Sequence, residues 1–203
     1  MTAAAFLAVV LIHLVAAMSP GPAFVVSVRL AASEGFRAAV ALALGFGLGA
    51  ALWAGAAMAG LALVFELVPQ LFVGLKLLGG AFLIYIAIQT WRHASAPLPD
   101  PGAVTSRSVG AAFRLGLLTF LTNPKSAVFF GAVFVGLVPV ETPLWTRAAL
   151  IAVIFVNETL WYCLVARLFS LPRPRAAYAR AKAWVDRAFG GLIAIFGLKI
   201  ATG

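Results

Sequence analysis

Polar and charged residues deep within the apolar stretches of this chain could bind a charged small molecule. Asn123 precedes Pro124 and Lys125 near the middle of one stretch, and Asn157 precedes Glu158 near the middle of another. A lysine at bilayer depth costs roughly 3 kcal/mol on insertion scales, so Lys125 should face the bundle interior and have a partner. Glu158 is the obvious partner. The two charges either straddle a substrate that bears both signs or form a purely structural pair.

Two proline motifs interrupt apolar stretches at matching places in the two halves of the chain, namely Ser19-Pro20-Gly21-Pro22 and Asn123-Pro124-Lys125. Proline removes a backbone donor and clashes with the preceding turn, so we expect a helix to open at each motif. In a bilayer, freed backbone groups are tolerated only where protein buries them or where they line a wet cavity. A corresponding pair of interrupted segments indicates a transporter's binding site. A packed kink is the structural alternative.

The other polar residues of the apolar stretches have structural explanations. Lys76 lies near enough to the end of its stretch to reach the interface. His13 stands alone on an apolar helix, where a buried, hydrogen-bonded histidine is expected rather than a proton relay. The single cysteine, Cys163, excludes an internal disulfide and a two-thiol relay. Since no metal-ligand cluster and no nucleophile–base pair is apparent, we expect no cofactor and no enzyme activity.

Composition places the chain among membrane proteins. Of its 203 residues, 64% are hydrophobic and only 10% are charged, which is too little charge for the surface of a soluble domain. Residues 1–28 and 38–65 contain no Lys, Arg, Asp or Glu. The net charge of +9 does not indicate nucleic-acid binding, because the basic residues lie between the apolar spans, where membrane topology explains them.

Hydropathy predicts an all-α membrane protein with six transmembrane helices in a single domain, residues 1–203. The expected spans are 4–28, 38–65, 67–91, 110–139, 146–170 and 184–202. A Pro-, Ala- and Ser-rich cytoplasmic linker, 93–108, separates a first repeat, 1–92, from a second, 109–203. Three spans per half is an odd number, so the two repeats should be inverted relative to each other, with the first helix of each repeat broken.

The basic residues of the loops predict the orientation of the chain in the membrane. The connections after spans one, three and five contain eleven of them: Arg29, Arg37, Arg92, Arg107, Arg114, Arg167, Arg173, Arg175, Arg180, Lys182 and Arg187. The opposite side has only Arg147 and Lys199, so both termini should lie outside the cytoplasm. The last cytoplasmic connection, about 176–187, reads either as a short helix on anionic headgroups or as a simple basic loop.

With these features assembled, the chain resembles the lysine exporter (LysE/RhtB) family of bacterial amino-acid efflux proteins. The residues that carry the resemblance are SPGP at 19–22, RAAVALALGFGLGA from Arg37, KLLGG from Lys76 with Tyr85, and LTNPKSA from Leu121. The similarity covers essentially the full length of the chain. The PGP and NPK motifs, in that order and at that separation, make the resemblance specific.

The resemblance implies a secondary transporter of the bacterial inner membrane that exports amino acids or close derivatives, driven by protons or another coupling ion. It places Pro20, Gly21, Pro22, Asn123, Pro124 and Lys125 in the central site. From the residues themselves, Ser19, Asn157 and Glu158 are added as substrate-binding candidates. The nearly polar-free second span favours a small or apolar amino acid. A homodimer is possible.

Two alternatives to amino-acid export remain at this point. A membrane-embedded enzyme or redox relay would require paired catalytic groups or thiols near mid-membrane. An ion or metal exporter or channel of similar helical architecture would require several deep carboxylates or thiolates, whereas Glu158 is the only deep carboxylate of the predicted spans.

Overall fold

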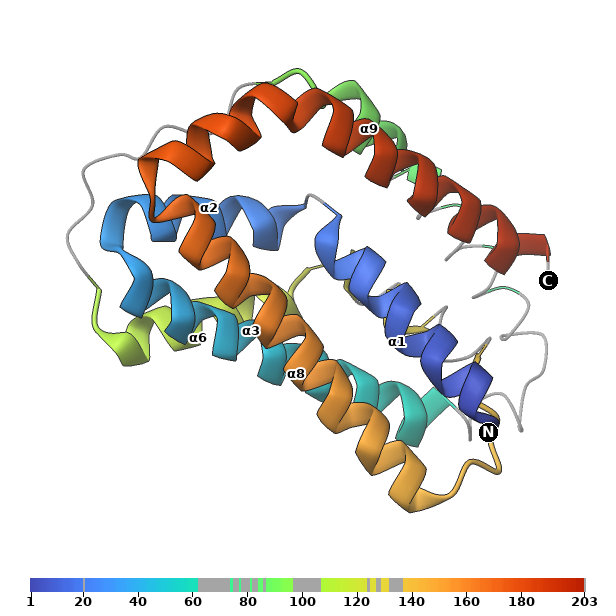
Figure 1. Cartoon of the computed structure of the whole chain (residues 1–203). Coiled ribbons are helices and arrows are strands. Elements are labelled where there is room, and N and C mark those ends of the chain that lie inside the picture. Colours follow the sequence, from blue (N-terminus) through green and yellow to red (C-terminus); the bar gives the residue numbers. More distant parts are fainter. Residues whose placement is uncertain are drawn as a thin grey trace.

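The computed structural model describes residues 1–19, 21–61, 74, 77, 81, 84, 85, 87–96, 107–123, 125, 126, 129–131 and 137–202. Within these ranges all regular secondary structure is helical, which confirms the predicted class (Figure 1). The elements are α1 (Ala3–Met18), α2 (Pro22–Glu34), α3 (Phe36–Ala56), the π-helical turn η1 (Ala57–Leu61), α6 (Val109–Leu121), α8 (Leu144–Phe169) and α9 (Pro172–Thr202).

Two of the described helices are long and apolar enough to cross a membrane, namely Phe36–Gly60 and Leu144–Phe169. A third span results if α1 and the first part of α2, Pro22–Ala31, are taken together as one bent element. These match the predicted spans 38–65, 146–170 and 4–28. Much of the predicted span 67–91 and of the linker lies outside the described residues, as does Lys76, so six spans and the inverted repeat stay predictions.

The first proline motif opens the helix, as predicted. Helix α1 ends at Met18, Ser19 is extended (φ −66°, ψ 128°), and α2 begins at Pro22 after an extended Gly21. Proline at the first helical position suits the start of α2, since its missing N–H would have no partner within the helix anyway. The axes of the two helices differ by 61°, so the chain turns sharply at the motif. Pro20 itself lies outside the described residues.

The second motif also interrupts its helix. Helix α6 ends at Leu121, and the chain is helical again at Lys125 and Ser126. Thr122 closes α6 in the usual way, because its backbone N–H donates to the Leu118 and Phe120 carbonyls. Pro124 lies outside the described residues. Both breaks therefore fall where the sequence places a proline within an apolar stretch.

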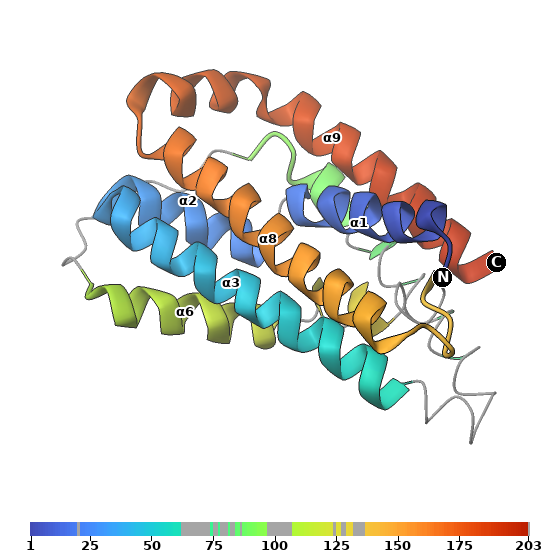
Figure 2. The same ribbon diagram turned by 60° about the horizontal axis from the view of Figure 1, so that its bottom comes forward.

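Helix α3 packs against both α6 and α8 and lies between them in the fold (Figure 2). Glycines permit this close approach: a Cβ at Gly45 would overlap the backbone of α6 at Phe113, and one at Gly116 would overlap the Leu42 carbonyl of α3. On the α8 side, a Cβ at Gly47 would overlap Thr159. The glycines of α3 thus form the surface through which this helix packs on its two neighbours.

Helix α9 differs from the prediction for the C-terminal region. The stretch 176–187 is neither a separate short helix nor a loop, because it is continuous with the last predicted span in one helix, Pro172–Thr202. The reason is local: between Pro174 and Gly190 the sequence is rich in alanine and contains no proline or glycine. In both views the N-terminal end of α1 and the C-terminal end of α9 lie at the same end of the molecule (Figures 1 and 2).

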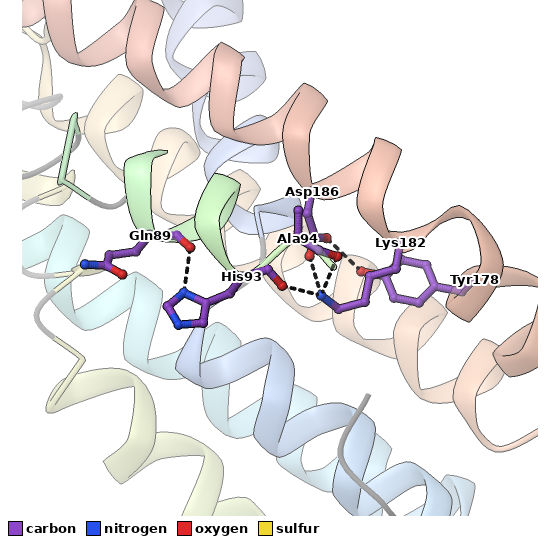
Figure 3. A network of polar contacts seen from close by, with 6 residues as sticks. All are labelled: Gln89, His93, Ala94, Tyr178, Lys182 and Asp186. Atoms are coloured by element: carbon purple, nitrogen blue, oxygen red, sulfur yellow. Dashed lines mark hydrogen bonds and ion pairs between the residues drawn. The ribbon is translucent and has the colours of Figure 1, made fainter. Parts of the chain in front are cut away.

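A polar network attaches α9 to the helix that ends near residue 92 (Figure 3). The Lys182 ammonium donates to the carbonyl oxygens of His93 at 3.0 Å and Ala94 at 3.1 Å, and it forms a 2.7 Å ion pair with Asp186. The Tyr178 hydroxyl donates to the other oxygen of Asp186 at 3.3 Å. A cation is favourable at these carbonyls because they follow the C-terminal end of a helix.

The close contact between α3 and α6 can be tested with a matched pair of variants on α3. We expect Gly45→Ala to lower the free energy of unfolding by about 1–3 kcal/mol, because backbone atoms, which have little freedom to move, occupy the space of the new methyl group. Gly55→Ala is the control, since its Cβ would meet only a side-chain atom of Ile151 at 3.8 Å. Thermal unfolding in detergent measures both. Equal stability of the two variants would contradict the packing described.

Candidate functional site

A pocket lies beside the first helix break, between α1, α8 and the segment that follows the second break. It encloses about 390 Å³ of empty space, part of which is open to the outside. Polar side chains converge on this space from segments far apart in the sequence: His13, Ser19, Asn123, Lys125, Ser126, Glu158 and Tyr162. Three phenylalanines complete much of the remaining wall: Phe120, Phe129 and Phe130.

Lys125 joins the two breaks. Its ammonium donates to the carbonyl oxygens of Ala16 at 3.0 Å and Ser19 at 2.9 Å, both at the C-terminal end of α1. In a continuous helix the Ala16 carbonyl would accept from residue 20, but Pro20 has no N–H. A cation is also favoured there by the partial negative charge of a helix C-terminus. Lys125 thus supplies a donor to the Ser19 carbonyl and a second donor to the Ala16 carbonyl, which otherwise accepts only from the Ser19 N–H at 3.3 Å.

The side chain of Asn123 fixes the backbone that presents Lys125. Its Oδ1 accepts a hydrogen bond from the Lys125 N–H at 3.0 Å, while its carbonyl accepts from the Ser126 N–H at 3.0 Å. An asparagine oxygen that accepts from an amide near a helix start is a cap, and it compensates for the interrupted helix. The first motif lies directly against this side chain, since a Cβ at Gly21 would be in ordinary van der Waals contact with the Lys125 ammonium nitrogen at 3.6 Å.

Glu158 contacts His13 across the pocket. Its Oε2 lies 3.4 Å from His13 Nε2, and each side chain is at most 3% exposed. The other ring nitrogen, Nδ1, is 3.1 Å from the Asn157 amide nitrogen, which also donates to the Val10 carbonyl oxygen at 3.3 Å. Consecutive residues of α8 therefore hold both edges of one imidazole ring on α1.

Aromatic rings surround these polar groups. The centroids of Phe129 and Phe130 each lie 5.7 Å from that of the His13 ring. The Tyr162 ring, one turn after Glu158 on α8, packs 4.6 Å from Phe46 of α3. Such walls exclude water, and electrostatic interactions inside them are stronger than they would be at the surface.

The structure brings together five of the predicted site residues: Ser19, Gly21, Asn123, Lys125 and Glu158 all line the pocket. Two others have different positions. Pro22 begins α2, and the Asn157 amide points to α1, where it bonds His13 and Val10. The remaining two, Pro20 and Pro124, lie outside the described residues.

Of the two alternatives left open for Lys125 and Glu158, a direct ion pair is not among the contacts of the described residues, although both residues line the same pocket. Glu158 lies within ion-pair distance of His13, and the Lys125 ammonium is bound by the two carbonyls of α1. The physical reason is that backbone carbonyls at a helix break compete for a buried cation as effectively as a carboxylate on a neighbouring helix. In the sequence, only the carboxylate can be recognised as a partner for Lys125.

The expectation of a buried, hydrogen-bonded His13 is confirmed, but sequence reasoning did not place His13 in the site and did not single out the phenylalanines. The available signal for His13 was its place six residues before Ser19 in a span without a charged residue. For Phe129 the signal was its spacing, four residues after Lys125, which puts it on the same helical face.

The family model described as "LysE type translocator" matches residues 14–203, which is nearly the whole chain. The chain belongs to this family. The match includes both proline motifs, Lys125 and Glu158, and it begins one residue after His13. Membership agrees with the apolar spans, and it makes this chain a membrane protein of a transporter family.

Two relatives with assigned functions are amino-acid efflux proteins. The threonine efflux protein of Escherichia coli (strain K12) is 37% identical over 201 residues, covering 96% of each chain. The homoserine/homoserine lactone efflux protein of Salmonella typhimurium (strain LT2) is 29% identical over 191 residues, covering 91% of this chain and 90% of the relative. An uncharacterized membrane protein of Escherichia coli (strain K12) is 33% identical over 186 residues. No solved structure matches the chain significantly.

The role of Lys125 in closing the first break can be tested by stability. We expect Lys125→Met to lower the free energy of unfolding by about 1–3 kcal/mol, since the carbonyl of the buried Ser19 loses its donor and the Ala16 carbonyl keeps only the Ser19 N–H. Arg173→Met, which removes a positive charge at an exposed position of α9, is the control and should unfold like the wild type. Unfolding in detergent, followed by loss of monodisperse protein, provides the measurement. An unchanged Lys125→Met transition would show that Lys125 does not support the break.

Proposed function

We propose that this protein is a secondary transporter that exports amino acids or close derivatives from the bacterial cytoplasm, driven by the proton gradient across the inner membrane. The observation that carries the proposal is the buried Lys125 ammonium at an opened helix, inside a pocket that also contains Glu158. A cation and a carboxylate in one pocket match the two charges of a free amino acid. The efflux relatives support the same substrate class.

The Lys125 side of the pocket suits the substrate carboxylate. An ammonium has three N–H donors, and the α1 carbonyls accept from two of them, so one donor stays available. The first amides of α2 add to it, because the N-terminal N–H groups of a helix have no partner within that helix. Ala23 of this first turn lines the pocket. Glu158 then provides the acceptor for the substrate ammonium.

The pocket supports a small substrate. Three phenylalanines restrict its walls and leave little room for a long substrate side chain. The Ser19 hydroxyl is buried at the pocket and makes no hydrogen bond among the described residues. A side-chain hydroxyl of the substrate would satisfy it. We therefore propose threonine and homoserine as the first amino acids to test.

The proposed transport cycle uses the predicted topology. Two inverted repeats would rock against each other around the pocket, so that the site opens alternately to each side of the membrane. The bias of basic residues supports placing both termini outside the cytoplasm. Their position at one end of the molecule agrees with an even number of spans (Figure 1).

Transport by the purified protein in proteoliposomes tests the proposal. We expect labelled threonine or homoserine to accumulate against its gradient when a pH gradient is imposed, and to stop when the pH gradient is collapsed. Divalent metal ions serve as the alternative substrates, and among the described residues no group of three possible metal ligands occurs. Metal transport without amino-acid transport would contradict the proposal.

A pair of variants tests the site itself. Lys125→Met should reduce threonine accumulation by about tenfold or more, because losing one charged hydrogen bond to the substrate carboxylate costs roughly 1.5–3 kcal/mol. Arg173→Met should transport like the wild type. Equal amounts of folded protein in the vesicles, measured by size-exclusion chromatography after extraction, are required for the comparison. Full accumulation by Lys125→Met would remove Lys125 from the site.

A further inference from the structure

We propose that Glu158 binds a proton and the ammonium of the substrate alternately, and that His13 and Asn157 position it for this exchange. The proposal rests on the proposed function, since it assigns the coupling of a proton-driven amino-acid exporter to one carboxylate. The carboxylate, the imidazole and the amide come from two helices, α1 and α8, which pack against each other.

Glu158 has no permanent cation in direct contact among the described residues, where its ion-pair contact is His13. It is 2% exposed, so an ionised carboxylate there requires a compensating charge or strong hydrogen bonds. Lys125 is the cation of the described pocket lining, but its ammonium donates to the Ala16 and Ser19 carbonyls and acts on Glu158 only through space. A proton or a substrate ammonium can supply what is missing.

The neighbours of the two ring nitrogens of His13 determine which nitrogen carries the hydrogen. The Asn157 amide nitrogen donates to the Val10 carbonyl oxygen, which identifies this atom as the nitrogen of the amide. The same nitrogen faces His13 Nδ1 at 3.1 Å, so Nδ1 accepts and carries no hydrogen. A neutral ring with a bare Nδ1 has its hydrogen on Nε2, and Nε2 faces Glu158. His13 is thereby held neutral as a donor to Glu158, and the exchangeable proton belongs to the carboxyl group.

Only a few titratable groups among the described residues surround the carboxyl group of Glu158. Within the described part of the pocket, the titratable groups near Glu158 are His13 from α1, Lys125 from the segment after the second break, and Tyr162 from α8 itself. The α2 residue that lines the pocket is Ala23. Phe46 of α3, which packs on Tyr162, is apolar. Glu158 is therefore the group from which a substrate ammonium would displace a proton.

The consequence is coupling by mutual exclusion. A protonated Glu158 is neutral and offers little to an ammonium, whereas an ionised Glu158 binds it by a charge-assisted hydrogen bond. The proton leaves the carboxyl oxygen when the substrate binds, and it returns from the outer side after the substrate has left. By linkage, a substrate that binds only the ionised form must release a proton as it binds.

Proton release on substrate binding is the direct test. When threonine is added to the purified full chain in weakly buffered detergent solution, a pH indicator should record about one proton released per threonine bound, at pH values where Glu158 starts protonated. Glu158→Gln should release none. Glu141→Gln makes the same chemical change at an exposed position outside the pocket and should behave like the wild type. Release that persists in Glu158→Gln would overturn the proposal.

Infrared spectroscopy tests the proton site without any substrate. The difference spectrum between acidic and alkaline pH should contain a carboxylic-acid band that is absent in Glu158→Gln and present in Glu141→Gln. Asn157→Leu should retain the band but change the pH at which it disappears, because His13 is then no longer restricted to the neutral form. The absence of any Glu158-dependent band, or an unchanged pH for Asn157→Leu, would contradict the assignment of Glu158 or of Asn157, respectively.

The two assays separate this inference from the proposed function. If no amino acid is transported but the Glu158-dependent band is present, the export proposal fails and Glu158 keeps its place as a proton-binding group. If threonine is transported without Glu158-dependent proton release, the export proposal stands and the alternation at Glu158 is wrong.

Discussion

The structure depends on one requirement, which is that the backbone carbonyls freed at the first helix break must find a donor away from water. In a bilayer no solvent can supply it, and an unsatisfied backbone group costs several kcal/mol. The Lys125 ammonium meets the requirement from more than a hundred residues away in the sequence, through bonds to Ala16 and Ser19. The interaction draws the second break to the first, and the pocket forms where they meet.

The glycine face of α3 supplies the second constraint. Helix α6, which leads into the second break, and α8, which carries Glu158, both pack on α3. Gly45 and Gly47 let these helices approach to backbone contact, so the distance between Lys125 and Glu158 is set by the helices and not by a bond between the two side chains. Both charges therefore line one pocket without direct contact, which is the arrangement that the proposed binding of a substrate with both charges requires.

The sequence predicted the elements that depend on local chemistry. Proline within an apolar stretch opens a helix wherever it occurs, so both breaks were found, and Lys125 and Glu158 were recognised because charge is rare in such stretches. The carbonyl partners of Lys125 could not be predicted, because backbone carbonyls leave no mark in a sequence. His13 was correctly expected to be buried and hydrogen-bonded, but its partners, Asn157 and Glu158, depend on α1 facing α8, a long-range arrangement. The continuity of α9 was missed because hydropathy was weighed above helix propensity.

An experimental structure of the protein in lipid nanodiscs tests the central claim most directly, since it locates the Lys125 ammonium relative to the first break. The account predicts that α1 ends before Pro20, that this ammonium lies within hydrogen-bonding distance of the Ala16 and Ser19 carbonyl oxygens, and that Glu158 stands across an open pocket next to His13. A helix that runs without interruption through residues 19–22, with Lys125 directed toward lipid or a membrane interface, would contradict it.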